Sequence, residues 1–149
     1  MNLFFEDACV HIYQDQGTAT IKWLGLAKSP TYRQTYEQFL EMLVLAATEE
    51  TPLNYWLFDC TEGKVIDIKD QSWTLIDWYE QLEAHTTCLP KRIAVILSKD
   101  IFNKIATRVI MSRIAQFAEA ELAYFSEEEE AREWLMKPEE MNEELVAIA

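Results

Sequence analysis

The chain has 149 residues, of which half are hydrophobic, and it carries a net charge of −13. That length and composition supply the core of one domain, while the negative field repels nucleic-acid phosphates and anionic membrane surfaces. The longest apolar runs, such as residues 42–47, are far too short to span a bilayer, so we expect neither nucleic-acid binding nor a membrane span.

The first predicted element is a β-hairpin. Residues 8–14 and 18–24 are rich in β-branched and aromatic residues and roughly alternate in polarity. The loop Asp15-Gln16-Gly17 joins them, and its glycine can adopt the positive φ that tight hairpin turns need. We therefore expect an antiparallel pair of strands at one side of a sheet.

A helix and a buried strand follow the hairpin. Ser29 is a typical N-cap and Pro30 suits the first helical position, and the apolar residues after them recur at helical spacing as far as Ala47. The segment 48–52 ends this helix. Residues 55–58 are aromatic and nearly all apolar, which is typical of a strand covered on both faces.

The next part of the chain repeats this alternation of helix and strand. A second helix is predicted over residues 69–84, a second interior strand over residues 92–98, and a third helix capped by Asp100. The strands on either side of each helix should run parallel, because a helical crossover returns the chain to the same edge of the sheet. In the third helix we expect four residues to face the sheet, namely Phe102, Ile105, Ala106 and Val109.

The last predicted elements are a strand over residues 121–126 and a short helix ending near Leu135, whose first turn is acidic. The order of elements predicts an α/β fold with a mixed five-stranded sheet and about four helices, in which an N-terminal antiparallel hairpin precedes β-α-β units. We expect residues 1–136 to form a single domain and residues 137–149 to form an acidic tail or a short docking segment.

Two of the predicted helices carry more apolar residues than one contact with a sheet requires. Surplus apolar helix surface usually marks a partner interface or a groove for a lipophilic ligand. We favour the contact surface of a homodimer over a ligand groove. The residues of this apolar set are Trp73, Ile76, Ile110, Met111, Ile114 and Phe117.

Asp59 and Cys60 stand where a buried strand ends, so they are candidates for chemistry. A phosphate-accepting aspartate would need a nearby acidic pair to bind Mg²⁺ and a lysine, and the predicted strand ends supply only Ser98. A nucleophilic Cys60 would need a base, and His85, three residues before Cys88, is not placed beside it. We interpret the corner as structural, with Asp59 accepting backbone N–H groups, and keep a thiol enzyme at Cys60 or Cys88 as the less favoured alternative.

Motifs for cofactors and metals are missing from the sequence. None of the glycine-rich phosphate loops occurs, and Cys9, Cys60 and Cys88 are too widely spaced for a zinc site or a disulfide framework. The N-terminal segment shows no signal-peptide pattern. We therefore expect no cofactor, no metal and no catalytic residues, and a cytoplasmic protein with reduced thiols.

The chain resembles a bacterial family in the phrases TIKWLG, PTYRQTYEQFLEML, YWLFDCTE, IKDQSW, RIAVILSKDIFNKIATRVI and AYFSEEEEAREWL. Together these phrases cover roughly residues 8–136. They are similar to the STAS-like proteins, a superfamily that contains anti-sigma-factor antagonists and is related in shape to CRAL-TRIO lipid-binding domains. The resemblance implies a non-enzymatic domain with a helix-backed sheet, used in regulatory protein contact or in sensing a small ligand.

Antagonists of that superfamily are switched by phosphorylation of a serine at the start of the helix after the central strand. Ser72 is the nearest candidate here, but Trp73 and Thr74 follow it instead of the residues that usually surround the switched serine. We therefore interpret Ser72 as an ordinary polar residue at the start of a helix. The leading hypothesis is a cytoplasmic STAS-like regulatory or protein-interaction domain that forms a homodimer. The alternative is a carrier or sensor of a small lipophilic ligand in an apolar groove.

Overall fold

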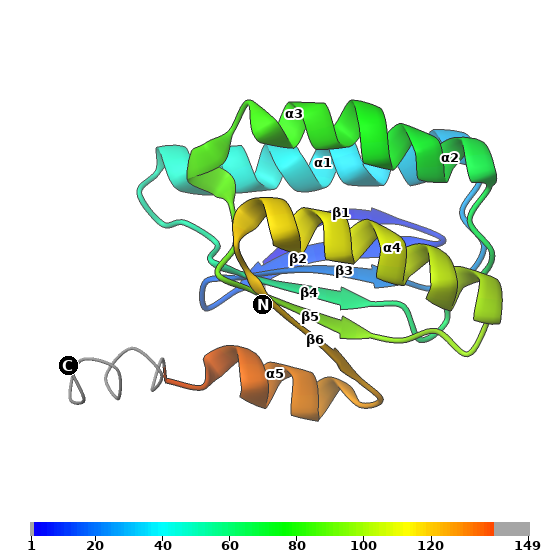
Figure 1. Cartoon of the computed structure of the whole chain (residues 1–149). Coiled ribbons are helices and arrows are strands. Elements are labelled where there is room, and N and C mark those ends of the chain that lie inside the picture. The colour runs from blue at the N-terminus through cyan, green and yellow to red at the C-terminus, as the bar shows by residue number, and fades with distance from the viewer. Residues whose placement is uncertain (1, 139–149) are drawn as a thin grey trace.

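The computed structural model describes residues 2–138, which form a six-stranded sheet with helices on both faces (Figure 1). β1, β2 and β3 pair antiparallel, and β3 to β6 pair parallel. The expected mixed α/β sheet is confirmed, but with six strands instead of five. Residues 139–149, most of the expected tail, lie outside the described residues. The strands, in spatial order, are β1 (Asn2–Asp7), β2 (Val10–Asp15), β3 (Thr18–Trp23), β4 (Tyr55–Asp59), β5 (Arg92–Ile96) and β6 (Glu121–Phe125).

β1 is the strand that the sequence pattern missed. Its residues are exposed or half-buried, and it pairs with β2 with an irregular register between Leu3 and Phe5. Such an edge strand does not need the alternation of polar and apolar residues by which a half-buried strand is recognised. The predicted hairpin is confirmed as β2 and β3, and Gln16 and Gly17 both have positive φ in its two-residue turn.

Four helical regions correspond to those predicted. The N-cap position of the first is Lys28, whose side chain makes no capping hydrogen bond. Ser29, the expected N-cap, donates its hydroxyl hydrogen bond to Asp70 instead. The second continues through a π-helical turn between two α-helical segments. The helices are α1 (Ser29–Thr48), α2 (Ile68–Trp73), the π-helical turn (Thr74–Trp78), α3 (Tyr79–Glu83), α4 (Ile101–Ala118) and α5 (Glu128–Met136).

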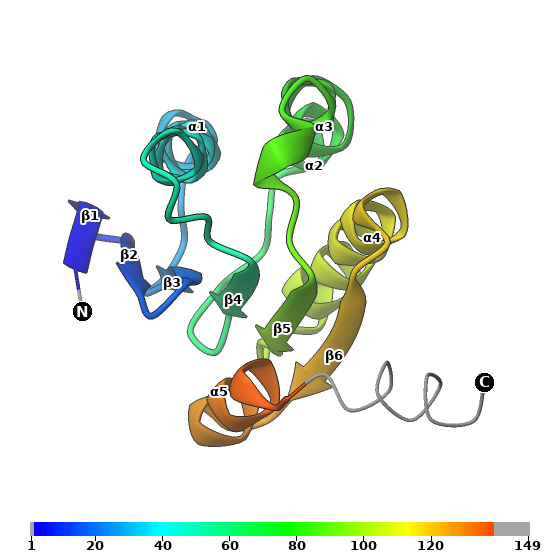
Figure 2. The same cartoon turned by 90° about the vertical axis from the view of Figure 1, so that its left-hand side faces the viewer.

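α1, α2, α3 and α4 cover one face of the sheet, and α5 covers the other (Figure 2). Each β-α-β unit steps to the next strand in the same direction, so right-handed crossovers place their helices on a common face. Open α/β sheets bind ligands in a crevice where the strand order reverses, and the order of the described strands does not reverse. The topology by itself therefore creates no ligand crevice in this sheet.

α5 is attached to the second face by Arg92, a buried residue at the start of β5. Its guanidinium donates hydrogen bonds to the carbonyl oxygens of Trp134, Leu135 and Lys137. Carbonyl groups at a helix end have no partner within the helix, and a cation is favourable there. A buried charge that the sequence pattern did not reveal thus holds the end of α5.

Candidate functional site

α4 lies on the sheet with a different rotation from the one expected. Phe102, Ile105 and Val109 are 67%, 56% and 54% exposed, and of the four residues expected to face inward Ala106 alone is buried. The prediction for Phe102, Ile105 and Val109 is therefore wrong. The residues of α4 that are buried are Asn103, Ala106, Thr107, Ile110, Met111, Ile114 and Ala115.

Asn103 and Thr107 lie on the buried side because they make hydrogen bonds there. Nδ2 of Asn103 donates to the carbonyl oxygen of Lys64 at 2.7 Å, and the Thr107 hydroxyl donates to Oδ1 of Asn103 at 3.0 Å. Gly63 permits this approach, since a Cβ atom there would lie 2.9 Å from Nδ2 of Asn103. A buried amide left without these partners costs about 1–3 kcal/mol, so the pair favours this rotation of the helix.

The rotation leaves four large apolar side chains on the outside of α4. We call Ile101, Phe102, Ile105 and Val109 the outer stripe; each is more than half exposed. Their spacing of three and four residues makes them neighbours on the helix surface. Single exposed apolar residues are ordinary, but a contiguous apolar patch marks contact with another molecule. The outer stripe is the strongest candidate for a functional surface among the described residues.

Three residues of the predicted interface set belong to the core. Ile110, Met111 and Ile114 are each 1% exposed. The expectation that they exceed the needs of one helix–sheet contact is corrected, because they make that contact. The exposed apolar residues of α4 are instead those of the outer stripe, three of which, Phe102, Ile105 and Val109, were expected to face the sheet.

The other three residues of that set lie nearer the surface. Phe117 is half-buried, and its ring packs on Tyr79 with 5.3 Å between ring centroids. Trp73 is also half-buried, and the Arg33 guanidinium lies 5.5 Å from its ring centroid. Ile76 is 64% exposed. Trp73 and Ile76 line the same open surface concavity, but the structure does not bring all six residues of the set together on one surface.

A buried carboxylate ties α1 to α2. Asp70 is 1% exposed, and it accepts hydrogen bonds from the Ser29 hydroxyl at 2.9 Å and from Nε of Arg33 at 3.0 Å. The Arg33 guanidinium also lies over the ring of Trp73, so the same cation makes an ion pair with Asp70 and a cation–π contact with Trp73. Sequence reasoning missed this network, because an acidic residue in a predicted helix gives no signal of burial.

Ser72, the candidate for a phosphorylation switch, is exposed but is not at a helix start. The N-cap of α2 is Asp67, whose carboxylate accepts the backbone N–H of Lys69 at 2.8 Å. Ser72 lies beyond the first turn, so the expected position is corrected, and a phosphate there would not meet the free N–H groups of the helix end. It lines an open surface concavity that also includes Arg33 and Asp77.

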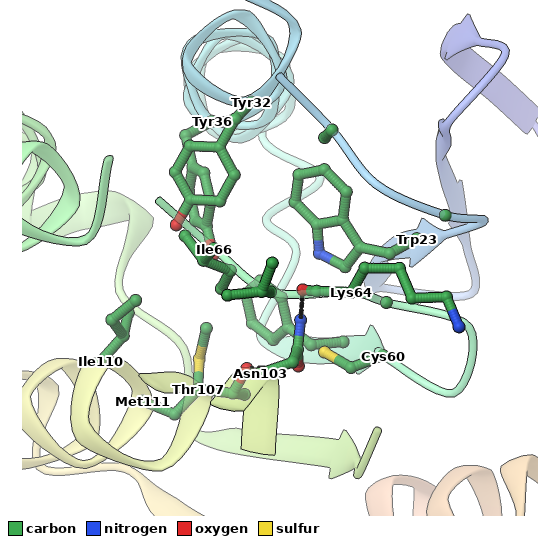
Figure 3. Close-up of a pocket in the computed structure, with 15 residues that line it drawn as sticks. Trp23, Tyr32, Tyr36, Cys60, Lys64, Ile66, Asn103, Thr107, Ile110 and Met111 are labelled. Atoms are coloured by element: carbon green, nitrogen blue, oxygen red, sulfur yellow. Dashed lines mark hydrogen bonds between the residues drawn. The ribbon is translucent and has the colours of Figure 1, made fainter. Parts of the chain in front are cut away.

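A small cavity lies between α1 and α4 at the carboxyl end of β4 (Figure 3). Its volume is about 20 Å³, which is room for roughly one water molecule. Pockets for drug-sized ligands measure about 300–1,000 Å³, so this cavity does not accommodate a lipophilic ligand as described. The residues around it include Trp23, Tyr32, Tyr36, Cys60, Asn103 and Met111.

The strand-end corner at Asp59 and Cys60 is buried. The Asp59 carboxylate accepts the backbone N–H of Thr61 at 3.1 Å and the Thr61 hydroxyl at 2.6 Å. Burial raises the pKa of the Cys60 thiol to about 12, which a hydrogen bond with Thr107 offsets only in part. At neutral pH this thiol is protonated, and a protonated thiol is a poor nucleophile.

Across the described residues, no hydrogen bond joins the side chains of Cys88 and His85. Burial raises the pKa of the Cys88 thiol above its ordinary value. Nδ1 of His85 donates to the carbonyl oxygen of Gln81 at 2.9 Å. Within residues 2–138, no group of three or more His, Cys, Asp or Glu side chains could hold a metal ion.

Comparison with known protein families, with curated proteins and with solved structures finds no significant match to the chain. In the part of the chain that the structure describes, no helix is long and apolar enough to cross a membrane. The site is therefore interpreted from its own geometry, in which the outer stripe of α4 stands out.

Proposed function

We propose that the protein is a non-enzymatic, cytoplasmic domain of STAS-like type that regulates other proteins by binding them through the outer stripe of α4. The observation that carries the proposal is the exposure of Ile101, Phe102, Ile105 and Val109 on one side of a helix. Full burial of a wholly exposed side chain of this kind contributes about 1.5–3 kcal/mol, and each of these side chains has more than half of its surface left to bury. The inner side of α4 is packed on the sheet, so the stripe is presented in a preformed arrangement.

The STAS-like part of the proposal is supported by the sheet, in which antiparallel strands precede parallel β-α-β units. It is also supported by the resemblance of the chain to that family over residues 8–136. Phosphorylation of Ser72 is not included, because this residue does not lie at the helix start that the family switch uses.

Two observations favour protein contact over the alternatives of a ligand carrier and a thiol enzyme. The cavity beneath α4 has room for roughly one water molecule. The raised pKa of the Cys60 thiol keeps it protonated at neutral pH. Native mass spectrometry that finds a lipid bound to the purified chain would contradict the proposal.

The proposal is tested by affinity capture from extracts of the native host. The wild-type chain is compared with Ile105→Glu, which places a charge in the outer stripe, and with Leu45→Glu, which places one at an exposed apolar position of α1. We expect a host protein to be captured by the wild-type chain and by Leu45→Glu but not by Ile105→Glu. The same host protein, once purified, must bind the wild-type chain directly. Equal capture by all three chains would contradict the role of the stripe.

A further inference from the structure

α4 is a positively charged helix in an acidic protein. Residues 101–118 include Lys104, Arg108 and Arg113 but no aspartate or glutamate, although the whole chain carries a net charge of −13. The Arg108 guanidinium lies 4.4 Å from the ring centroid of Tyr124, and that of Arg113 lies 4.6 Å from the ring centroid of Tyr79. Both charges are thereby held beside the helix.

An apolar stripe beside fixed positive charges suits an acidic amphipathic segment. The apolar side of such a segment would cover the stripe, and its carboxylates would face the arginines and Lys104. Two outer stripes packed on each other would instead bring these positive charges together. The charge pattern therefore favours an acidic partner over a symmetric contact between two copies of α4.

The chain contains such a segment in residues 139–149, EEMNEELVAIA. Met141, Leu145 and Ile148 are four and three residues apart, the spacing that places side chains on one side of a helix. Four glutamates accompany them. This sequence has both features that the outer stripe requires, an apolar side and negative charge.

The location of α5 argues against docking within the same chain. Arg92, at the start of β5, holds the carbonyl of Lys137, whereas the outer stripe lies on the opposite face of the sheet and begins after the far end of β5 (Figures 1 and 2). To reach the outer stripe of its own chain, the segment after Lys137 would have to run the length of β5, about 17 Å, and cross between layers spaced roughly 10 Å apart. If residues 139–149 bound as a helix, the form that presents an apolar side, they would span about 16 Å, which is shorter than that route.

We propose that the outer stripe of α4 binds residues 139–149 of a second copy of this chain. Two copies that exchange this contact form a two-fold dimer with two identical contacts. The inference rests on the proposed function, and it deepens that function, because a regulated partner would compete with the segment for the stripe. Dimerisation then controls access to the binding surface.

The test is the mass of the full chain in solution, measured by sedimentation equilibrium over a range of concentrations. Ile105→Glu damages the stripe and Leu145→Glu damages the segment, so each should weaken dimerisation about tenfold or more. Leu45→Glu and Asn142→Glu add the same charge away from the stripe and from the apolar side of the segment. We expect both control variants to dimerise as the wild-type chain does.

A mixture of Ile105→Glu and Leu145→Glu provides the decisive measurement. Neither variant alone retains an intact contact, but the mixed dimer has one, between the intact stripe of Leu145→Glu and the intact segment of Ile105→Glu. We expect the mixture to associate more strongly than either variant alone, and the association to weaken with added salt. Dimerisation of Leu145→Glu equal to wild type would overturn the proposal in favour of a contact without the segment.

A monomeric wild-type chain at all concentrations would also overturn this inference. If Ile105→Glu nevertheless lost a host protein in the capture experiment, the proposed function would stand. If Ile105→Glu changed neither the mass nor the capture, both proposals would fail. If a monomeric wild-type chain sedimented with vesicles of anionic phospholipid and Ile105→Glu did not, the stripe would be assigned to a membrane surface instead.

Discussion

The two sides of α4 reverse the usual distribution of polar and apolar side chains. The inner side buries Asn103 and Thr107 together with Ile110, whereas the outer side exposes Phe102 and Ile105. The inner polar residues have hydrogen-bond partners beneath the helix, and the outer apolar residues have no neighbour in the described chain that buries them. Burial thus follows where hydrogen-bond partners and packing space exist, and the unmatched apolar side is left exposed.

The largest difference between the two sides should appear when a core side chain is shortened. Ile110→Ala leaves a cavity against the sheet, and we expect the free energy of unfolding to fall by about 2–5 kcal/mol. Ile105→Ala makes the same kind of change on the outer stripe and should stay within about 0.5 kcal/mol of wild type. Urea denaturation of both variants measures the contrast, and equal losses would show that the two sides do not differ.

Removal of the inner hydrogen bonds should have the next largest effect. Asn103→Ala removes the donor to the Lys64 carbonyl and the acceptor for Thr107, so the free energy of unfolding should fall by about 1–3 kcal/mol. Hydrogen exchange should become faster in the loop that contains Gly63 and Lys64. Thr48→Ala, at the exposed end of α1, is the control, and an unchanged loop in Asn103→Ala would contradict the holding role of Asn103.

Cys60, beneath the inner side of α4, should make stability depend on pH. Its folded pKa of about 12 exceeds the ordinary thiol pKa of 9.0, so its contribution to stability is fully present below about pH 9 and is lost as the pH rises toward 12. Between pH 8 and pH 10 the resulting loss in the free energy of unfolding is about 1 kcal/mol. The free energy of unfolding of Cys60→Ala should therefore fall less steeply over that range, and parallel curves for the two proteins would refute the assignment.

The smallest effect on folding is expected on the outer side. Phe102→Ser removes an aromatic ring that is 67% exposed, so at low protein concentration the free energy of unfolding should change by no more than about 0.5 kcal/mol. The same variant should bind partners of the outer stripe less tightly, because the ring is no longer available for burial. A loss of stability comparable to that of Ile110→Ala would place Phe102 in the core after all.

Local patterns in the sequence predicted most elements of the fold. Gln16 and Gly17 stand in the hairpin turn that was expected, and the apolar periodicity located four helical regions. β1 was missed because its residues are exposed or half-buried without a regular alternation along the strand. The buried Asp70 and Arg92 could not be recognised either, since their partners lie far along the chain and no local pattern announces such contacts.

The sequence by itself determined the kinds of element and their order, because turn residues and apolar periodicity act over a few neighbours. It also placed apolar residues on both sides of α4, and the rotation that we expected from them was wrong. The tertiary structure decided it, because Asn103 finds the Lys64 carbonyl and Gly63 leaves room for the contact. The candidate site, the outer stripe, exists only as a consequence of that choice, so a pattern read along one helix could not reveal it.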